Sequence, residues 1–187
     1  MPRPNWFFAF PIDGTFVLDL PDPPPLFRRF HPDDVHCTVS FLGGCGEQAA
    51  ERALAALELR LAQLRPQPVD VSLGEVVPMG PKARYSALSA LLERGRVETE
   101  SHIAGLRDAL SEAALGRLEK RPPKAHVTIA RPGRGASDLR RQEGLSWAKT
   151  LDVRSVTARL DRIALYTWSE DRRERLFRIV TERPLET

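Results

Sequence analysis

Two segments of this chain match each other and lie ninety residues apart. Residues 36–44 read HCTVSFLGG and residues 126–134 read HVTIARPGR, so each segment begins with a histidine and has a threonine two positions later. Because side chains alternate between the two faces of a strand, the His and Thr of each segment share one face and the apolar residues between them share the other. The sequence therefore predicts two strands with one polar and one apolar face, placed in two similar halves of the chain.

The remaining residues predict strands and helices in the order β-α-β-β-α-β-β-β. Apolar residues recur at steps of three and four from Glu47 to Leu64, and again in residues 97–118, which predicts two amphipathic helices. Further strands are expected at residues 6–10, 69–77, 83–92, 155–168 and 175–181. This order predicts an α+β fold over residues 1–187 as a single bilobal domain, in which two similar lobes of mainly antiparallel strands have helices outside and a central cleft carrying the two His-x-Thr strands.

Two segments predict irregular structure instead. Residues 20–34 contain five prolines, and because each proline removes a backbone donor, an extended surface connection is expected there. Residues 131–144, RPGRGASDLRRQEG, predict a basic loop. Residues 131–141 of this loop are either a solvated connection or contact a phosphate backbone.

Composition excludes several classes of protein. The chain has 187 residues, of which 42% are hydrophobic, enough for the core of one ordinary domain. The two cysteines, Cys37 and Cys45, form no C-x-x-C pair, so neither a disulfide framework nor a cysteine zinc site is indicated. The apolar run near the N-terminus is too short for a signal peptide and nothing resembles a membrane span, so we expect a cytoplasmic protein without a membrane partner.

The charge balance suits an anionic substrate. The formal net charge is +3 and the sequence pI is about 9.2, which is mildly basic and falls short of a protein that coats DNA.

Two His–Thr pairs that face one cleft suit phosphate chemistry. Imidazole is neutral or protonated near pH 7, so one His can act as a base while the other acts as an acid. Two similar lobes place one His on each side of a phosphorus atom, as in-line displacement requires, and the Thr hydroxyls can hold phosphate oxygens. This chemistry needs no metal and no cofactor. The alternative is that both histidines are core or edge residues without a role in catalysis.

The sequence resembles the 2H phosphoesterases, whose signature is two His-x-Thr/Ser strands in two similar lobes. Within that superfamily it is most similar to the RNA 2',3'-cyclic phosphodiesterases of bacteria and archaea, also called 2'-5' RNA ligases. The resemblance covers nearly the whole chain: FFAF at 7–10, HCTVSFLG at 36–43, HVTIAR at 126–131 and the last two strands in 163–186. Where that family usually has a helix before the first His strand, this chain has its proline-rich segment.

The resemblance implies hydrolysis of a terminal 2',3'-cyclic phosphate of RNA to a 2'-phosphomonoester, with reversible 2'-5' ligation if a 5'-hydroxyl replaces water. By the same resemblance, His36 is the general acid, His126 the general base, and Thr38 and Thr128 bind the phosphate. The implied partners are RNA with 2',3'-cyclic phosphate ends or cyclic nucleotides, and we expect a monomer.

Arg131 matches an arginine that often follows the second motif in this family. Strict alternation places it on the face opposite to His126, so it reaches the cleft as a substrate-binding residue only through a bulge or at the end of the strand. Otherwise Arg131 is a solvated residue with a structural role.

Other functions and residues remain open. The chain could be a catalytically silent nucleotide-binding module on the same fold, or a structural or RNA-chaperoning protein that uses its basic loops. His31 and His102 have no partner at metal-ligand spacing and are expected outside the site. Phe41, Tyr166 and Trp168 either stack on a base or belong to the core.

Overall fold

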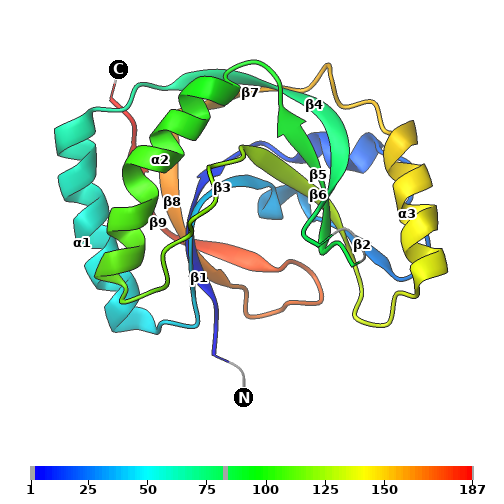
Figure 1. The fold of residues 1–187 in the computed structure, drawn as a ribbon, viewed down its shortest axis with the longest axis horizontal. Coiled ribbons are helices and arrows are strands. Elements are labelled where there is room, and N and C mark those ends of the chain that lie inside the picture. Colours follow the sequence, from blue (N-terminus) through cyan, green and yellow to red (C-terminus); the bar gives the residue numbers. More distant parts are fainter. Residues whose placement is uncertain (1–2, 82–83, 187) are drawn as a thin grey trace.

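The computed structural model describes residues 3–81 and 84–186, and its centre is a curved sheet of nine strands with helices outside (Figure 1). The strands are β1 Trp6–Pro11, β2 Phe27–Arg29, β3 His36–Gly43, β4 Val69–Met79, β5 Ala87–Leu92, β6 His126–Pro132, β7 Thr157–Leu160, β8 Arg162–Trp168 and β9 Phe177–Pro184. The helices are α1 Glu47–Leu64, α2 Arg96–Ala113 and α3 Asp138–Thr150, and two short 3-10 helices are η1 Thr15–Asp19 and η2 Pro32–Asp34.

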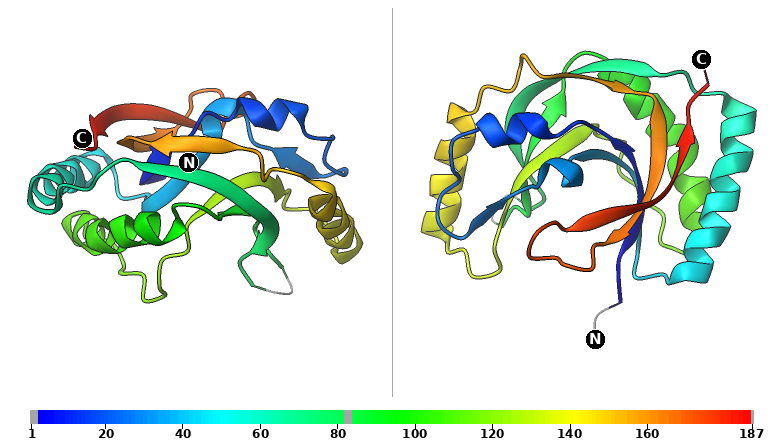
Figure 2. Two further views of the ribbon diagram at one scale, coloured as in Figure 1. Left: turned by 90° about the horizontal axis from the view of Figure 1, so that it is seen from above. Right: turned by 180° about the vertical axis from the view of Figure 1, so that it is seen from behind.

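The sheet places the two His strands side by side at its centre. Its order is β7-β4-β5-β6-β3-β1-β8-β9, with β2 added to the edge of β6, and the neighbouring strands are antiparallel. Helices α1 and α2 lie together beside one half of the sheet and α3 beside the other (Figure 2). The expected α+β fold with mainly antiparallel strands and helices outside is confirmed.

The two predicted helices are present, and their ends have local causes. Helix α1 has the expected bounds; Arg65 closes it in the left-handed conformation and Pro66 follows. Helix α2 ends at Ala113, five residues earlier than expected. There Leu115 has a positive φ of 56°, and the N–H groups of Leu115 and Gly116 donate to the carbonyls of Glu112 and Ser111, which is a Schellman motif.

The expectation of a basic loop over residues 131–144 is wrong in its second half, because helix α3 begins at Asp138. Ser137 is the N-cap, and its side chain accepts a hydrogen bond from the Arg140 N–H. The helix buries Gly144 and Trp147, and a Cβ at Gly144 would lie 2.3 Å from the Phe27 ring. The close approach of α3 to its neighbours therefore depends on that glycine.

Three other expectations need correction. Residues 155–168 form two strands: β7 pairs with β4 at one end of the sheet, while β8 pairs with β1 and β9 at the other. The proline-rich connection also contains strand β2, which pairs with β6 through residues 27–29, after its run of prolines. Strand β5 begins at Ala87 instead of residue 83, which lies outside the described residues.

None of the helices in residues 3–81 and 84–186 is long and apolar enough to cross a membrane.

Candidate active site

The backbone pair Cys37–Val127 joins the two His strands. Both side chains are fully buried on the core face of the sheet. Residues one step away on each strand therefore point to the other face. Continuing this antiparallel register places His36 across from Thr128 and Thr38 across from His126. The two His–Thr pairs are thus related by a local twofold axis through the Cys37–Val127 pair.

The two imidazoles are held in the same way. Nδ1 of His36 lies 2.6 Å from the carbonyl oxygen of Asp34, and Nδ1 of His126 lies 2.6 Å from that of Lys124. Because a carbonyl oxygen can only accept, Nδ1 donates in both cases. In the neutral ring this leaves Nε2 as a proton acceptor on the far side of each imidazole.

Both histidines titrate at lower pH than usual. Burial lowers the pKa of His36 to about 4; the hydrogen bond to Asp34 opposes this shift, and the charges of Arg131 and His126 add to it. Burial also lowers the pKa of His126; the hydrogen bond to the Lys124 carbonyl opposes this shift, and the charges of Lys124 and Arg131 add to it. Both imidazoles are therefore neutral in the free protein near pH 7.

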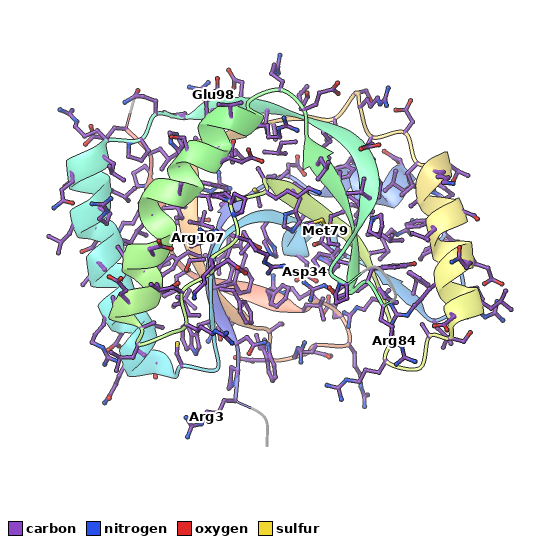
Figure 3. All side chains as sticks on the ribbon, viewed as in Figure 1. Arg3, Asp34, Met79, Arg84, Glu98 and Arg107 are labelled. Atoms are coloured by element: carbon purple, nitrogen blue, oxygen red, sulfur yellow. The ribbon has the colours of Figure 1, made fainter. Side chains whose placement is uncertain are left out.

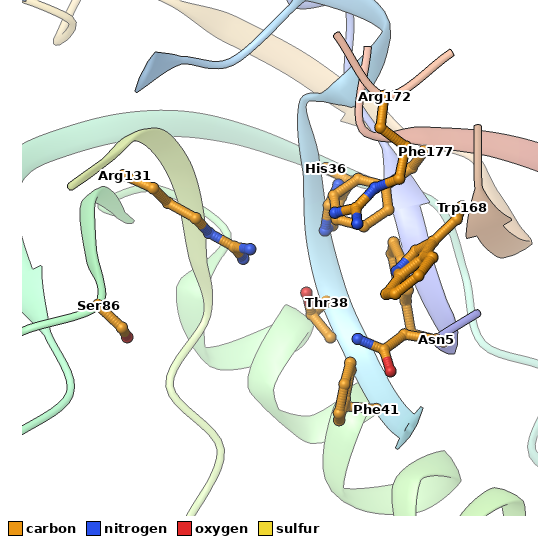
Figure 4. Close-up of a pocket in the computed structure, with 10 residues that line it drawn as sticks. Asn5, His36, Thr38, Phe41, Ser86, Arg131, Trp168, Arg172 and Phe177 are labelled. Atoms are coloured by element: carbon orange, nitrogen blue, oxygen red, sulfur yellow. The ribbon is translucent and has the colours of Figure 1, made fainter. Parts of the chain in front are cut away.

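A cavity of about 290 Å³ lies on this face of the sheet (Figure 4). It is lined by three of the predicted site residues, His36, Thr38 and Arg131. His126 and Thr128 are on the adjacent strand and do not line this cavity. The structure thus gathers all five predicted residues around the paired strands, but only three of them at the cavity.

A bulge in β6 explains how Arg131 reaches the cavity. Ser89 pairs with Thr128 and Leu88 pairs with Ala130, so Ile129 is an extra residue in β6. The extra residue reverses the alternation, which brings Arg131 to the face of His126. The Arg131 guanidinium points toward Thr38 in Figure 4, and its Cζ lies 5.1 Å from the centre of the Phe30 ring.

A second arginine at the cavity comes from the turn between β8 and β9. Arg172 lines the cavity and its guanidinium lies 4.0 Å from the centre of the Trp168 ring. The side chain of Arg28 fixes this turn by donating to the carbonyls of Arg172, Arg173 and Glu174 at 2.6 to 3.1 Å. The sequence analysis did not single out Arg172.

Asp34 fixes the same turn from the inside. It is fully buried, near the middle of the molecule in Figure 3, and its carboxylate accepts from the N–H groups of Leu176 and Phe177 at 2.7 to 3.0 Å. Its main-chain carbonyl accepts from His36. Asp34 therefore connects the orientation of His36 to the cavity wall that Phe177 forms.

The cavity is electrostatically suited to an anion. Two arginines line it, and no Asp or Glu is among its described lining residues. Within residues 3–81 and 84–186, neither Arg131 nor Arg172 forms a salt bridge. Those charges remain available to a phosphate.

Ser89 is another residue that sequence reasoning missed. It is fully buried on β5, and its Oγ lies 3.2 Å from Oγ1 of Thr128. This contact fixes the Thr128 hydroxyl beside the twofold axis. A serine inside the apolar strand ALSALL is the only sequence signal for it.

The three aromatic candidates have different roles. Tyr166 belongs to the core, where its ring stacks on Phe7 at 4.9 Å with an interplanar angle of 3°. Phe41 and Trp168 instead line the cavity.

The two remaining histidines make local contacts away from this cavity. His31 caps η2 by accepting from the Asp33 N–H, and His102 lies 2.9 Å from the carbonyl of Gln67. In the part of the chain that the structure describes, no group of three or more His, Cys, Asp or Glu side chains could hold a metal ion.

Comparison with known proteins gives one curated relative and a set of similar structures. No family model matches the chain. The RNA 2',3'-cyclic phosphodiesterase of Bacillus subtilis (strain 168) is 28% identical over 144 residues, which cover 71% of this chain and 74% of the relative. The E. coli LigT structure with 3'-AMP covers 100% of both chains with a TM-score of 0.69 and 16% identity. TT0787 of Thermus thermophilus covers 97% of both chains with a TM-score of 0.69 and 17% identity.

The fold is that of the LigT-like phosphoesterases. This fold and the curated relative agree with the resemblance to the 2H phosphoesterases that the sequence shows.

Proposed function

We propose that this protein hydrolyses the 2',3'-cyclic phosphate at an RNA end by acid–base catalysis with His36 and His126. One observation carries the proposal: the two imidazoles are related by a local twofold axis, and the Nδ1 of each donates a hydrogen bond to the carbonyl oxygen two residues earlier in the chain. Each ring therefore offers Nε2 for proton transfer from one side of a shared site.

The proposed reaction needs one proton donor and one acceptor. His126 takes a proton from water, and the resulting hydroxide attacks phosphorus in line with the bond to the ribose 3'-oxygen. As that bond breaks, His36 gives its proton to the departing oxygen, which leaves a 2'-phosphomonoester. The assignment of acid and base follows the family resemblance. If a 5'-hydroxyl replaces water, the same groups form a 2'-5' linkage.

Binding of the anionic substrate favours the protonated histidine that the general acid requires. Both histidines are neutral in the free protein, so one must gain a proton before it can act as an acid. A phosphate anion nearby raises an imidazole pKa because it stabilises the charged form. Binding of substrate is therefore coupled to proton uptake. Arg131 and Arg172 offset the remaining negative charge, and the Thr38 and Thr128 hydroxyls donate to phosphate oxygens.

The relatives support a nucleotide substrate. The curated relative is named as an RNA 2',3'-cyclic phosphodiesterase, and E. coli LigT has been crystallised with 3'-AMP and with ATP.

The experiment offers the protein a 2',3'-cyclic mononucleotide and an oligonucleotide that ends in a cyclic phosphate, with EDTA present. We expect a 2'-phosphomonoester, identified by phosphorus NMR, at the same rate with and without EDTA, because the proposed chemistry uses only side chains. Binding without any product would support the silent binding module. Strict dependence on an added divalent ion would contradict the two-histidine scheme.

A further inference from the structure

The two histidines are held alike, but the peptide groups that hold them have different partners. Each Nδ1 donates to the carbonyl oxygen of a peptide group whose N–H points the other way. That N–H belongs to Val35 beside His36 and to Ala125 beside His126. Its acceptor differs between the two halves of the molecule.

Beside His126 the acceptor is a carboxylate. Oε1 of Glu100, on helix α2, accepts from the Ala125 N–H at 3.1 Å. The carbonyl of the same peptide group, that of Lys124, accepts from Nδ1 of His126 at 2.6 Å. One peptide group therefore connects a carboxylate to the imidazole through two hydrogen bonds.

Beside His36 the acceptor is neutral. The Val35 N–H donates to the carbonyl oxygen of Pro32 at 3.2 Å. The carboxylate of Asp34 belongs to the same segment, but it accepts from the N–H groups at the start of β9. The local twofold axis thus relates the two imidazoles and their carbonyl acceptors, while the contact of the carboxylate on α2 is made in one half only.

The charged and titratable groups near His126 come from four parts of the chain: Lys124 before the strand, Arg131 on β6, His36 on β3 and Glu100 on α2. The partner of His126 on β5 is Leu91, which has no charge. The cations disfavour a protonated imidazole, and Glu100 is the group among these four that favours it.

The charge of Glu100 is not neutralised by a neighbouring cation. Within residues 3–81 and 84–186, Glu100 forms no salt bridge. Its charge also reaches the residue pair on the twofold axis. Burial raises the pKa of the Cys37 thiol, the backbone of His126 opposes this shift, and the charge of Glu100 adds to it.

We propose that Glu100 is a positioning residue that makes His126 a stronger base. Its carboxylate polarises the peptide group between Lys124 and Ala125, because hydrogen bonds in a chain strengthen one another. The carbonyl oxygen then accepts more strongly from Nδ1, which stabilises the imidazolium that forms when Nε2 takes a proton from water. This inference rests on the proposed function, and it gives the choice of His126 as the base a physical cause.

The test compares Glu100→Gln with the wild type in two measurements. The Gln amide oxygen can still accept from the Ala125 N–H, but it has no charge. We expect the pKa of His126, followed by NMR of its imidazole in the free protein, to fall. With a 2',3'-cyclic nucleotide, kcat should fall roughly 3- to 30-fold, a part of the 10²- to 10⁴-fold that a general base contributes. KM should change little, because Glu100 is not among the described residues that line the cavity.

Two further variants separate the effect through the peptide group from other effects of charge. Glu98→Gln removes a carboxylate at an exposed position of the same helix and should change neither the His126 pKa nor kcat. Glu100→Asp keeps the charge but withdraws the carboxylate by one methylene, which breaks the hydrogen bond to Ala125. The pKa of His126 should then lie between those of the wild type and Glu100→Gln.

The outcomes separate this inference from the proposed function. An unchanged His126 pKa or an unchanged kcat in Glu100→Gln overturns it, as does an equal effect of Glu98→Gln. A wild-type pKa in Glu100→Asp also overturns it, because the charge would then act through space. If Glu100→Gln does not fold, Glu100→Asp decides by the same measurements. If the wild type turns over no cyclic nucleotide, the proposed function fails, and the NMR titration alone decides whether Glu100 acts on His126.

Discussion

The ring of His36 lies in apolar surroundings although its proposed role is polar. The ring centres of Phe7, Tyr166 and Phe177 lie 4.9, 5.3 and 5.7 Å from that of His36. These neighbours exclude water, which is why burial is the largest cause of its low pKa. Burial therefore keeps His36 neutral in the free protein, and the proposed reaction requires an anion to raise its pKa again.

This arrangement should make the fold sensitive to acid. The unfolded chain protonates His36 near pH 6.5, while the folded protein keeps it neutral down to about pH 4. As the pH falls from 6.5 to 4, the unfolded state binds a proton that the folded state does not, so the free energy of unfolding should fall by about 3 kcal/mol through this group. Between pH 7 and pH 4, the free energy of unfolding measured with denaturant should fall less in His36→Gln than in the wild type. His102→Gln is the control, and an equal loss in all three proteins would contradict the assignment.

Proton uptake on anion binding is a second consequence at the residue scale. Calorimetric titrations with sulfate in buffers of different ionisation enthalpy measure how many protons the protein takes up on binding. Sulfate has no proton of its own near pH 7. Because the bound anion raises the imidazole pKa, we expect an uptake that approaches one proton per bound ion. The double variant His36→Ala with His126→Ala should bind sulfate without uptake. Binding to the wild type with no uptake would show that neither histidine is charged by the ligand.

At the scale of elements, the site depends on a contact between η2 and the start of β9. Three backbone hydrogen bonds to the buried Asp34 carboxylate hold these elements together, and they lie more than 140 residues apart in the chain. The same contact brings the β8–β9 turn to the cavity. A single side chain thus determines where Arg172 and Phe177 lie relative to His36.

Replacing this carboxylate should loosen both the fold and the cavity wall. Asp34→Asn puts an amide N–H₂ against backbone donors, so we expect the free energy of unfolding to fall by about 2 to 4 kcal/mol and KM to rise more than kcat falls. Asp33→Asn is a close control: Asp33 is exposed and makes a surface salt bridge with Arg175, so its loss should cost at most about 1 kcal/mol. Equal effects of the two substitutions, measured by denaturation and steady-state kinetics, would contradict this role of Asp34.

At the scale of the whole molecule, the sequence predicted the elements that have a strong local pattern. The two His strands and α1 have clear periodicity, and the fold class follows from their order. The split of residues 155–168 into β7 and β8 depends on pairing with β4 and β1, which local sequence does not encode. Helix α3 was missed because its apolar residues are sparse; it buries a glycine, a tryptophan and an alanine.

The candidate site was predictable to a similar extent. The spacing of His36, Thr38, His126 and Thr128 showed that they share a face of two strands. Arg131 depended on a bulge that only the pairing of β6 with β5 shows. Arg172 and Asn5 reach the cavity from the β8–β9 turn and from the residue before β1, so no local pattern marks them.

The central claim is that His36 and His126 act together in one reaction. The most direct measurement is kcat/KM for a 2',3'-cyclic nucleotide in the wild type, His36→Ala, His126→Ala and the double variant, with affinity for the 2'-phosphate product measured alongside. Each single substitution should lower turnover by about 10²- to 10⁴-fold, and the double variant should lose little more than the worse single variant, because the two groups serve one step. Product affinity should fall much less than turnover, since Arg131, Arg172 and the threonines remain. Near wild-type turnover in either single variant, with circular dichroism confirming its fold, would contradict the two-histidine mechanism.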